Sequence, residues 1–167
     1  MKPIPKAGIV LGVLVEIWTY LMGITGWYKD PHLLYVFYVV ILIEVGVLLW
    51  GLKMTAAQGR GYGAQVGAGT LIAVIGAVII FIGAYIFTAV VYPNYFTELN
   101  EMQRSMGAAQ GMTQEQINAQ IAMMAPMQTP FVNALTGAFM TVVTGFVASL
   151  IIGAFIKAAP ATQSKTN

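Results

Sequence analysis

Two glutamates are the residues of this chain whose type and position could support chemistry. Glu16 and Glu44 lie near the middle of two long apolar stretches, residues 7–27 and 33–52, and neither stretch contains Lys, Arg or His. About 20 apolar residues in a helix are enough to cross the hydrocarbon core of a bilayer. An ionisable side chain at that depth costs about 2.5–3.5 kcal/mol on insertion scales, so it marks a candidate functional site by default.

Helix geometry predicts that the two glutamates share one depth. Counted from the cytoplasmic ends assigned below at about 1.5 Å per residue, Glu16 lies about 14 Å deep and Glu44 about 12 Å deep. Tyr20 is one turn from Glu16, and Thr141 and Thr144 of the last apolar stretch fall near the same level. We therefore predict an intramembrane polar site made of Glu16, Glu44, Tyr20, Thr141 and Thr144.

Three interpretations of this polar site are open. The carboxyl groups could hold helices together, since interhelical hydrogen bonds contribute to helix association in lipid. They could instead bind a proton or a cation. They could also contact a partner subunit or a cofactor outside this chain, because Glu44 shares a helix face with Phe37, Ile41 and Leu48.

The composition predicts an integral membrane protein. Hydrophobic residues make up 58% of the chain and charged residues only 8%, against about 25% charged residues in soluble domains. Lys2 and Lys6 precede the first apolar stretch, as in a signal peptide, but Glu16 and the lack of a small-residue cleavage site favour an uncleaved span. We expect one all-α membrane domain over residues 1–167, with spans at 7–27, 33–52, 63–92 and 130–156 and a cytoplasmic tail at 157–167.

Residues 94–125, between the third and fourth spans, are predicted to form an amphipathic helical hairpin. Tyr95, Leu99, Met102 and Met106 fall on one helical face. Further on, Thr113 and Gln116 have the spacing of a capping box, which indicates the start of a second helix.

The basic residues predict the orientation of the spans. In a four-span arrangement Lys29 and Arg104 lie on one side, and the other side carries Lys2, Lys6, Lys53, Arg60, Lys157 and Lys165. Positive residues collect on the cytoplasmic side of membranes. We therefore expect a multi-pass protein of the bacterial inner membrane with both termini in the cytoplasm and the hairpin outside.

Small residues recur along three of the spans at helical spacing and predict close helix packing. In lipid, such residues allow two backbones to approach each other. The residues expected at helix contacts are Gly8, Gly12, Gly69, Gly76, Gly83, Gly137, Gly145, Ser149 and Gly153.

The sequence offers no set of residues for catalysis. It has no cysteine and one histidine, so we expect no thiol chemistry, no metal site and no cofactor. Met123 and Met127 have a spacing that could bind Cu(I), but methionine more often fills hydrophobic contacts. We expect that the protein is not an enzyme. Its small net charge of +2 also gives no reason to expect nucleic-acid binding.

Residues 92–157 resemble a known family. The resemblance rests on Tyr92-Pro93, on Glu98 followed by Glu101-Met102-Gln103-Arg104, and on Gly111-Met112-Thr113-Gln114-Glu115-Gln116-Ile117. A Met/Pro-containing stretch and a glycine-rich last span ending in Lys157 complete it. These residues are similar to the bacterial four-span membrane family labelled domain of unknown function 4199 (DUF4199). The resemblance implies four spans and an outer helical hairpin, and it brings no established activity or site residues.

Together these features favour a non-catalytic inner-membrane protein that acts as a scaffold or accessory subunit of a larger membrane assembly. Its expected partners are the lipid bilayer and other membrane subunits or further copies of itself. The alternative hypothesis is a small carrier or channel that binds protons or cations at Glu16 and Glu44.

Overall fold

The computed structural model describes residues 2–156, and within this range the chain is helical without any strand. The predicted all-α membrane class is therefore confirmed, while the expected tail at 157–167 lies outside the described residues. The helices in chain order are α1 (Pro3–Thr25), η1 (Trp27–Lys29), η2 (Pro31–Tyr38), α2 (Val39–Ala56), α3 (Tyr62–Ile86), η3 (Phe87–Val91), α4 (Tyr95–Ala109), α5 (Gln114–Met124), η4 (Ala125–Met127) and α6 (Pro130–Phe155).

Four of these segments are long and apolar enough to cross a membrane: α1, η2 with α2, α3 with η3, and α6. They correspond to the four predicted stretches, with shifted ends. The first begins earlier than predicted, at Pro3. Proline is tolerated in the first turn of a helix, because the N–H that it lacks would have no hydrogen-bond partner there. The second runs past Lys53 to Ala56, since a basic residue suits the last turn of a helix.

Side-chain caps fix the starts of several helices. The Asp30 carboxylate accepts a hydrogen bond from the His32 backbone N–H at 2.8 Å, just before Pro31 opens η2. At α5, the capping box predicted between Thr113 and Gln116 is confirmed. Each cap satisfies a backbone donor that the first helical turn would otherwise leave unpaired.

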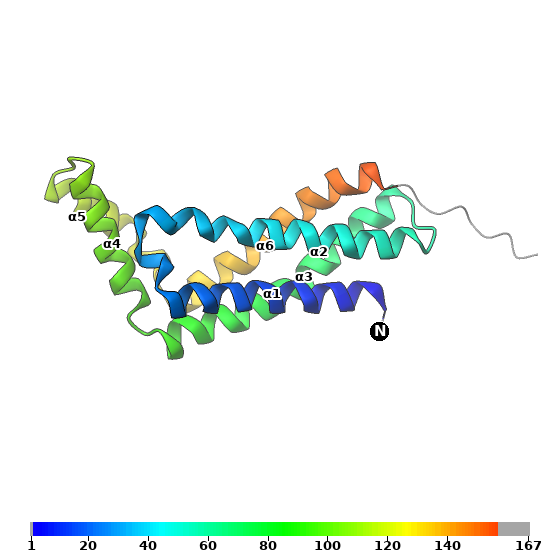
Figure 1. The fold of residues 1–167 in the computed structure, drawn as a ribbon, viewed down its shortest axis with the longest axis horizontal. Coiled ribbons are helices and arrows are strands. Elements are labelled where there is room, and N and C mark those ends of the chain that lie inside the picture. The colour runs from blue at the N-terminus through cyan, green and yellow to red at the C-terminus, as the bar shows by residue number, and fades with distance from the viewer. Residues whose placement is uncertain (1, 157–167) are drawn as a thin grey trace, which may run out of the picture.

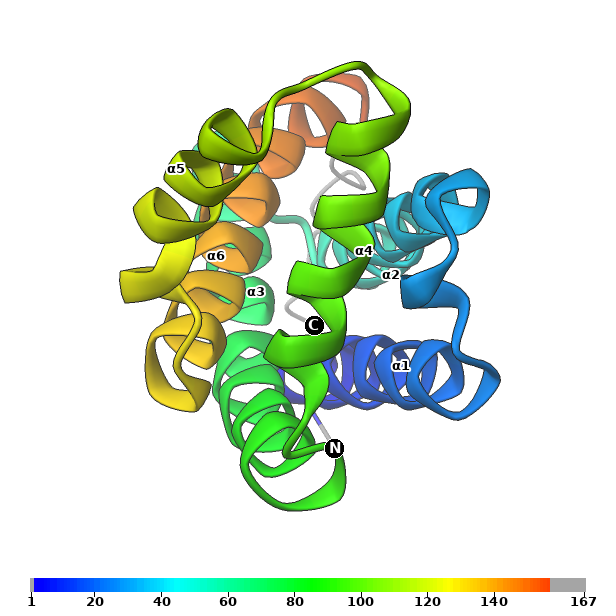
Figure 2. The same ribbon diagram turned by 90° about the vertical axis from the view of Figure 1, so that its left-hand side faces the viewer.

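Helix α3 is the centre of the bundle, since it packs against α1, α2 and α6 and its contacts with α6 and α1 are the most extensive between the described helices (Figures 1 and 2). The buried core joins all four spans through Leu11 of α1, Leu48 of α2, Ile72 of α3 and Ala148 of α6.

Small residues lie where α3 meets its neighbours. Side chains occupy the space in which a Cβ at these glycines would lie: Ile75 at Gly8, Ile79 at Gly12, Leu11 at Gly76 and Ser149 at Gly69. In the same way Gly145 of α6 lies against Ala73 of α3. Helices α1 and α6 therefore approach α3 more closely than larger residues would allow.

Two of the glycines expected at helix contacts differ from this pattern. Gly153 has ordinary contacts, with ring carbons of Tyr62 3.5 Å from the position of its absent Cβ. At Gly137, no atom of the described residues lies within 4 Å of that position.

Helices α4 and α5 lie across one end of the bundle (Figures 1 and 2). They contact each other where Gly107 meets Ile117 and where the Arg104 guanidinium donates to the Asn118 side chain at 2.6 Å. The side-chain amides of Asn100 and Gln128 donate to each other at 2.9 and 2.7 Å. These bonds hold α4 against the segment that leads into α6.

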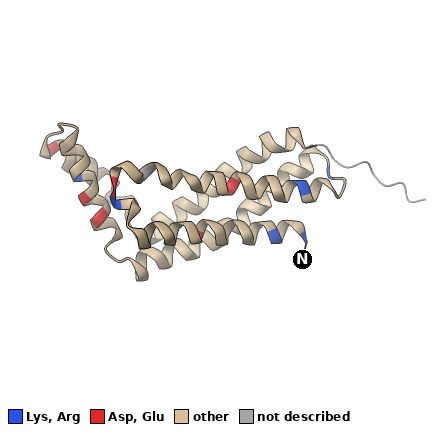
Figure 3. Cartoon of the chain, in the orientation of Figure 1, with Lys and Arg blue, Asp and Glu red and all other residues tan. Residues whose placement is uncertain are grey.

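Charged residues are unevenly distributed along the bundle (Figure 3). The end with the N-terminus of α1 and the α2–α3 turn carries Lys2, Lys6, Lys53 and Arg60. The end covered by α4 and α5 carries Lys29 and Arg104 together with Asp30, Glu98, Glu101 and Glu115. The distribution follows the loop pattern of the sequence, and the sidedness of the protein in a membrane stays a prediction.

Candidate functional site

Glu16 projects from α1 onto the backbone of α3. Its carboxyl group occupies the space in which a Cβ of Gly83 would lie. Both carboxyl oxygens are buried, and neither has a hydrogen-bond partner within residues 2–156. One turn further along α1, the Tyr20 hydroxyl donates to the Gly83 carbonyl at 3.4 Å. The structure therefore brings Glu16 and Tyr20 together at Gly83.

Glu44 projects from α2 towards α6 and is only 4% exposed. Its Oε1 atom lies 3.1 Å from the position that a Cβ of Gly145 would take. This oxygen is also buried without a hydrogen-bond partner among the described residues. The absence of side chains at Gly83 and Gly145 thus makes room for both carboxyl groups.

The five residues of the predicted polar site do not form one hydrogen-bonded cluster. The two carboxyl groups contact different glycines, on different helices. The Thr141 hydroxyl donates to the Gly137 carbonyl of its own helix at 3.0 Å, and half-buried Thr144 is the chain neighbour of Gly145. Among the described residues, no hydrogen bond joins either threonine to a glutamate. The functional role of this set stays a prediction.

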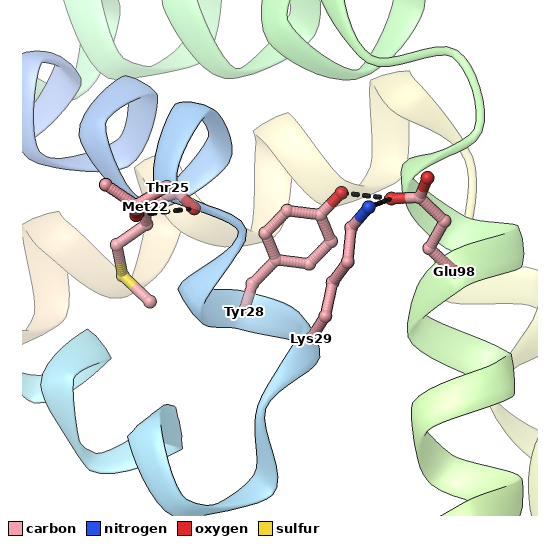
Figure 4. A network of polar contacts seen from close by, with 5 residues as sticks. All are labelled: Met22, Thr25, Tyr28, Lys29 and Glu98. Carbon is pink, nitrogen blue, oxygen red and sulfur yellow. Dashed lines mark hydrogen bonds and ion pairs between the residues drawn. The ribbon is translucent and has the colours of Figure 1, made fainter.

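A second group of polar residues lies at the hairpin end of the bundle (Figure 4). The Tyr28 hydroxyl and the Lys29 ammonium group both bind the same carboxylate oxygen of Glu98 on α4, and the Lys29 distance is 3.0 Å. These contacts connect the α1–η2 link to α4. Hydrogen bonds from Tyr28 and Lys29 hold the pKa of the Glu98 carboxyl below its ordinary value. Burial and the Glu98 charge raise the pKa of the Tyr28 hydroxyl.

Aromatic rings surround this group of polar residues. The ring centroids of Tyr28 and Tyr95 are 5.0 Å apart, and those of Phe87 and Tyr92 are 4.7 Å apart.

Sequence reasoning did not find the link between Tyr28, Lys29 and Glu98. The available signal was Lys29, one of only two cations on a side of the protein that is otherwise rich in acidic residues.

Two cavities lie at the two ends of the bundle. One is lined by Lys2, Pro3, Ile4, Pro5, Gln58 and Arg60. The other is lined by Val91, Tyr92, Pro93, Asn94, Tyr95 and Glu98. Glu16 and Glu44 line neither of them. Within residues 2–156, no group of three or more His, Cys, Asp or Glu side chains is arranged to hold a metal ion.

Comparison with known proteins adds the family. Comparison with curated proteins and with solved structures gives no match. A family model described as protein of unknown function (DUF4199) matches residues 6–158. This range reaches into all four apolar spans, as the resemblance of residues 92–157 implied. The chain is therefore a multi-pass membrane protein that belongs to the DUF4199 family.

Proposed function

We propose that the chain is a non-catalytic scaffold or accessory subunit of a larger assembly in the bacterial inner membrane. In this proposal both termini lie in the cytoplasm, and α4 and α5 lie outside. The observation that supports the proposal is the outward face of α2, which the other helices of residues 2–156 leave uncovered.

The second span packs least against the rest of the chain. Its buried share is 18%, against 39% for the first span. Exposed apolar side chains recur along it every three or four residues, at Tyr35, Tyr38, Leu42, Val45 and Leu49. Among them Gly46 has no atom of the described residues within 4 Å of its absent Cβ. Large side chains around one small residue suit the close approach of a second transmembrane helix.

Native electrophoresis of the full chain in a mild detergent tests this proposal. We expect the wild type to migrate as a complex. The Gly46→Leu variant should migrate as a free chain, because the added side chain fills the space at Gly46 that the partner helix would occupy. The matched control is Gly67→Leu on α3, which also has open space at its Cβ and should leave the complex intact. Migration of the wild type as a free monomer, or a Gly46→Leu variant that behaves like the wild type, would contradict the proposal.

The unpartnered carboxyl groups favour a second candidate function, a proton or cation carrier. Buried ionisable groups inside a membrane protein commonly mark ion pathways, and Glu16 has two carboxyl oxygens without a partner among the described residues. We rank this candidate second because both carboxyl groups pack on glycines and line neither cavity.

Flux measurements in proteoliposomes distinguish the two candidates. A carrier requires that Glu16→Gln and Glu44→Gln each abolish proton or sodium flux while thermal unfolding shows an intact fold. Glu115→Gln, an exposed acidic residue of α5, is the control and should keep the flux. Wild-type liposomes without flux across a pH gradient or a sodium gradient would refute the carrier.

A further inference from the structure

The larger cavity has the features of a binding site. It lies between the start of α1 and the turn that joins α2 to α3, and its volume is about 460 Å³. This volume falls within the range of about 300–1,000 Å³ that is typical of small-molecule sites.

The cavity has a basic lining. Lys2 and Arg60 line it, and no acidic residue within residues 2–156 does. The acidic residues of the whole chain are Glu16, Asp30, Glu44, Glu98, Glu101 and Glu115, all in the middle of the spans or at the hairpin end. Within residues 2–156, neither Lys2 nor Arg60 forms an ion pair. Two cations that face one cavity without a carboxylate attract an anion.

Buried hydrogen bonds hold the backbone of Arg60 in place. Fully buried Gln65 donates through its side-chain amide to the Arg60 carbonyl at 3.3 Å and accepts from the Thr55 hydroxyl at 2.7 Å. Gly59 has a φ of 76°, a left-handed conformation that suits glycine and turns the chain just before Arg60. The turn therefore presents a guanidinium group, whose planar donors match the oxygens of a phosphate.

Apolar residues line the same cavity. Pro3, Ile4 and Pro5 belong to the lining together with the polar residues Lys2, Gln58 and Arg60. Exposed Trp50 and Tyr62 lie at the same end of the spans, and such aromatic residues favour the interface between membrane and water. The Lys6 ammonium group lies over the Trp50 ring, 5.4 Å from its centroid. A ligand with an anionic head and an apolar body matches this mixed basic and apolar lining better than a free anion does.

We propose that this cavity binds the headgroup of an anionic phospholipid. Arg60 and Lys2 contact the phosphate, Gln58 donates a hydrogen bond to it, and Pro3, Ile4 and Pro5 contact the glycerol and the first acyl carbons. Basic pockets at the end of transmembrane helices bind acidic headgroups in this manner. The site requires neither a partner subunit nor ion transport, so it is independent of the proposed function.

Titration of the full-length protein with phosphatidylglycerol, followed by native mass spectrometry in a mild detergent, tests the proposal. Each cation near a charged headgroup contributes about 1 kcal/mol, which corresponds to about a fivefold change in affinity. Arg60→Gln and Lys2→Gln should each weaken phosphatidylglycerol binding about fivefold. The matched control Arg104→Gln removes the same charge at the hairpin end and should leave the affinity unchanged.

Three further measurements make the outcome decisive. Arg60→Lys keeps the charge but loses the planar donors, and it should bind with an affinity between those of the wild type and Arg60→Gln. Zwitterionic phosphatidylcholine, whose choline cation offsets the phosphate charge, should bind the wild type more weakly than phosphatidylglycerol does, and Arg60→Gln should weaken its binding by a smaller factor. Displacement of phosphatidylglycerol by millimolar inorganic phosphate would identify a site for free anions and overturn the lipid assignment. Equal losses in Arg104→Gln and Arg60→Gln would overturn the site itself.

Discussion

Substitution of Gly145 by alanine tests the close packing of α6 on α3. The added Cβ would overlap the Ala73 Cβ and would lie 3.7 Å from the Ala73 Cα. Both methyl carbons are attached directly to backbone, so no rotamer change relieves the overlap. Methyl carbons pack at about 3.5–4.0 Å, and the two helices would therefore have to separate by about 1 Å.

The expected cost follows from this displacement. Overpacking of a close-packed contact costs about 1–3 kcal/mol. For a chain of 167 residues, each kcal/mol lowers the unfolding midpoint by about 2–4 °C. We expect Gly145→Ala to lower the midpoint of thermal unfolding in detergent by about 2–12 °C.

Two further variants separate packing from helix propensity. Gly137→Ala places the same methyl on the same helix, where the described residues leave open space. It should match or slightly exceed the stability of the wild type, since alanine favours helix over glycine by about 1 kcal/mol. In the double variant Ala73→Gly/Gly145→Ala, the nearest remaining group is Glu44 Oε1 at 3.1 Å. Small adjustments of Glu44 relieve this contact, so most of the lost stability should return.

The measurement is the thermal unfolding of the four proteins under one set of detergent conditions, monitored by the far-UV circular dichroism that reports secondary structure. Equal unfolding temperatures for Gly145→Ala and Gly137→Ala would refute the predicted overlap between α6 and α3. A double variant no more stable than Gly145→Ala would also refute it, because the methyl groups at positions 73 and 145 would then not be in contact.

The remaining predictions concern polar contacts at the two ends of the bundle. The pKa of the Glu98 carboxyl is lower in the folded protein than its ordinary value of 4.5. Glu98 therefore contributes fully to the docking of α4 above pH 4.5. This contribution is lost as the pH falls through the lower pKa of the folded state. The protection of the α4 amides against hydrogen exchange, relative to their intrinsic rate, should therefore fall below pH 4.5, and Glu98→Gln should remove this pH dependence. Tyr28→Phe deletes the hydrogen bond that contributes most to the shift, so the acid transition should move to higher pH in the same assay. At the other end, Thr55→Val leaves the buried Gln65 oxygen without its donor. This variant should lose about 1–3 kcal/mol of stability in thermal unfolding. Thr25→Val, at an exposed site, is the control and should lose less.

The sequence was sufficient to predict the helical architecture. Apolar length predicts the four spans, and the glycines of α1 at helical spacing predict a closely packed face, which in the structure meets α3. The spacing of Gly8, Gly12 and Glu16 along α1 places all three against α3. Helix ends were less predictable, because proline at the first turn and a basic residue in the last turn both extend a helix beyond its apolar stretch.

The arrangement of the glutamates shows where sequence reasoning stops. Depth along a helix follows from residue counting, but the direction of a side chain around the helix axis depends on which neighbour packs there. Residue counting places Glu16 and Glu44 at one level, whereas packing directs Glu16 to Gly83 and Glu44 to Gly145. The bond between Tyr28 and Glu98 was unpredictable for a related reason. It spans 70 residues of sequence and depends on how α4 crosses the bundle.

The central position of α3 has a consequence for the biogenesis of the protein. Chains are synthesised from the N-terminus, and their early segments begin to fold first. The helix that packs most extensively against the other described spans therefore enters the membrane after α1 and α2. Until α3 arrives, Gly83 cannot cover the Glu16 carboxyl, and the glycine face of α1 lacks its native neighbour. A nascent chain that pauses before residue 62 therefore presents the Glu16 carboxyl within the bilayer, and the arrival of α3 supplies the glycine that covers this group in the folded protein.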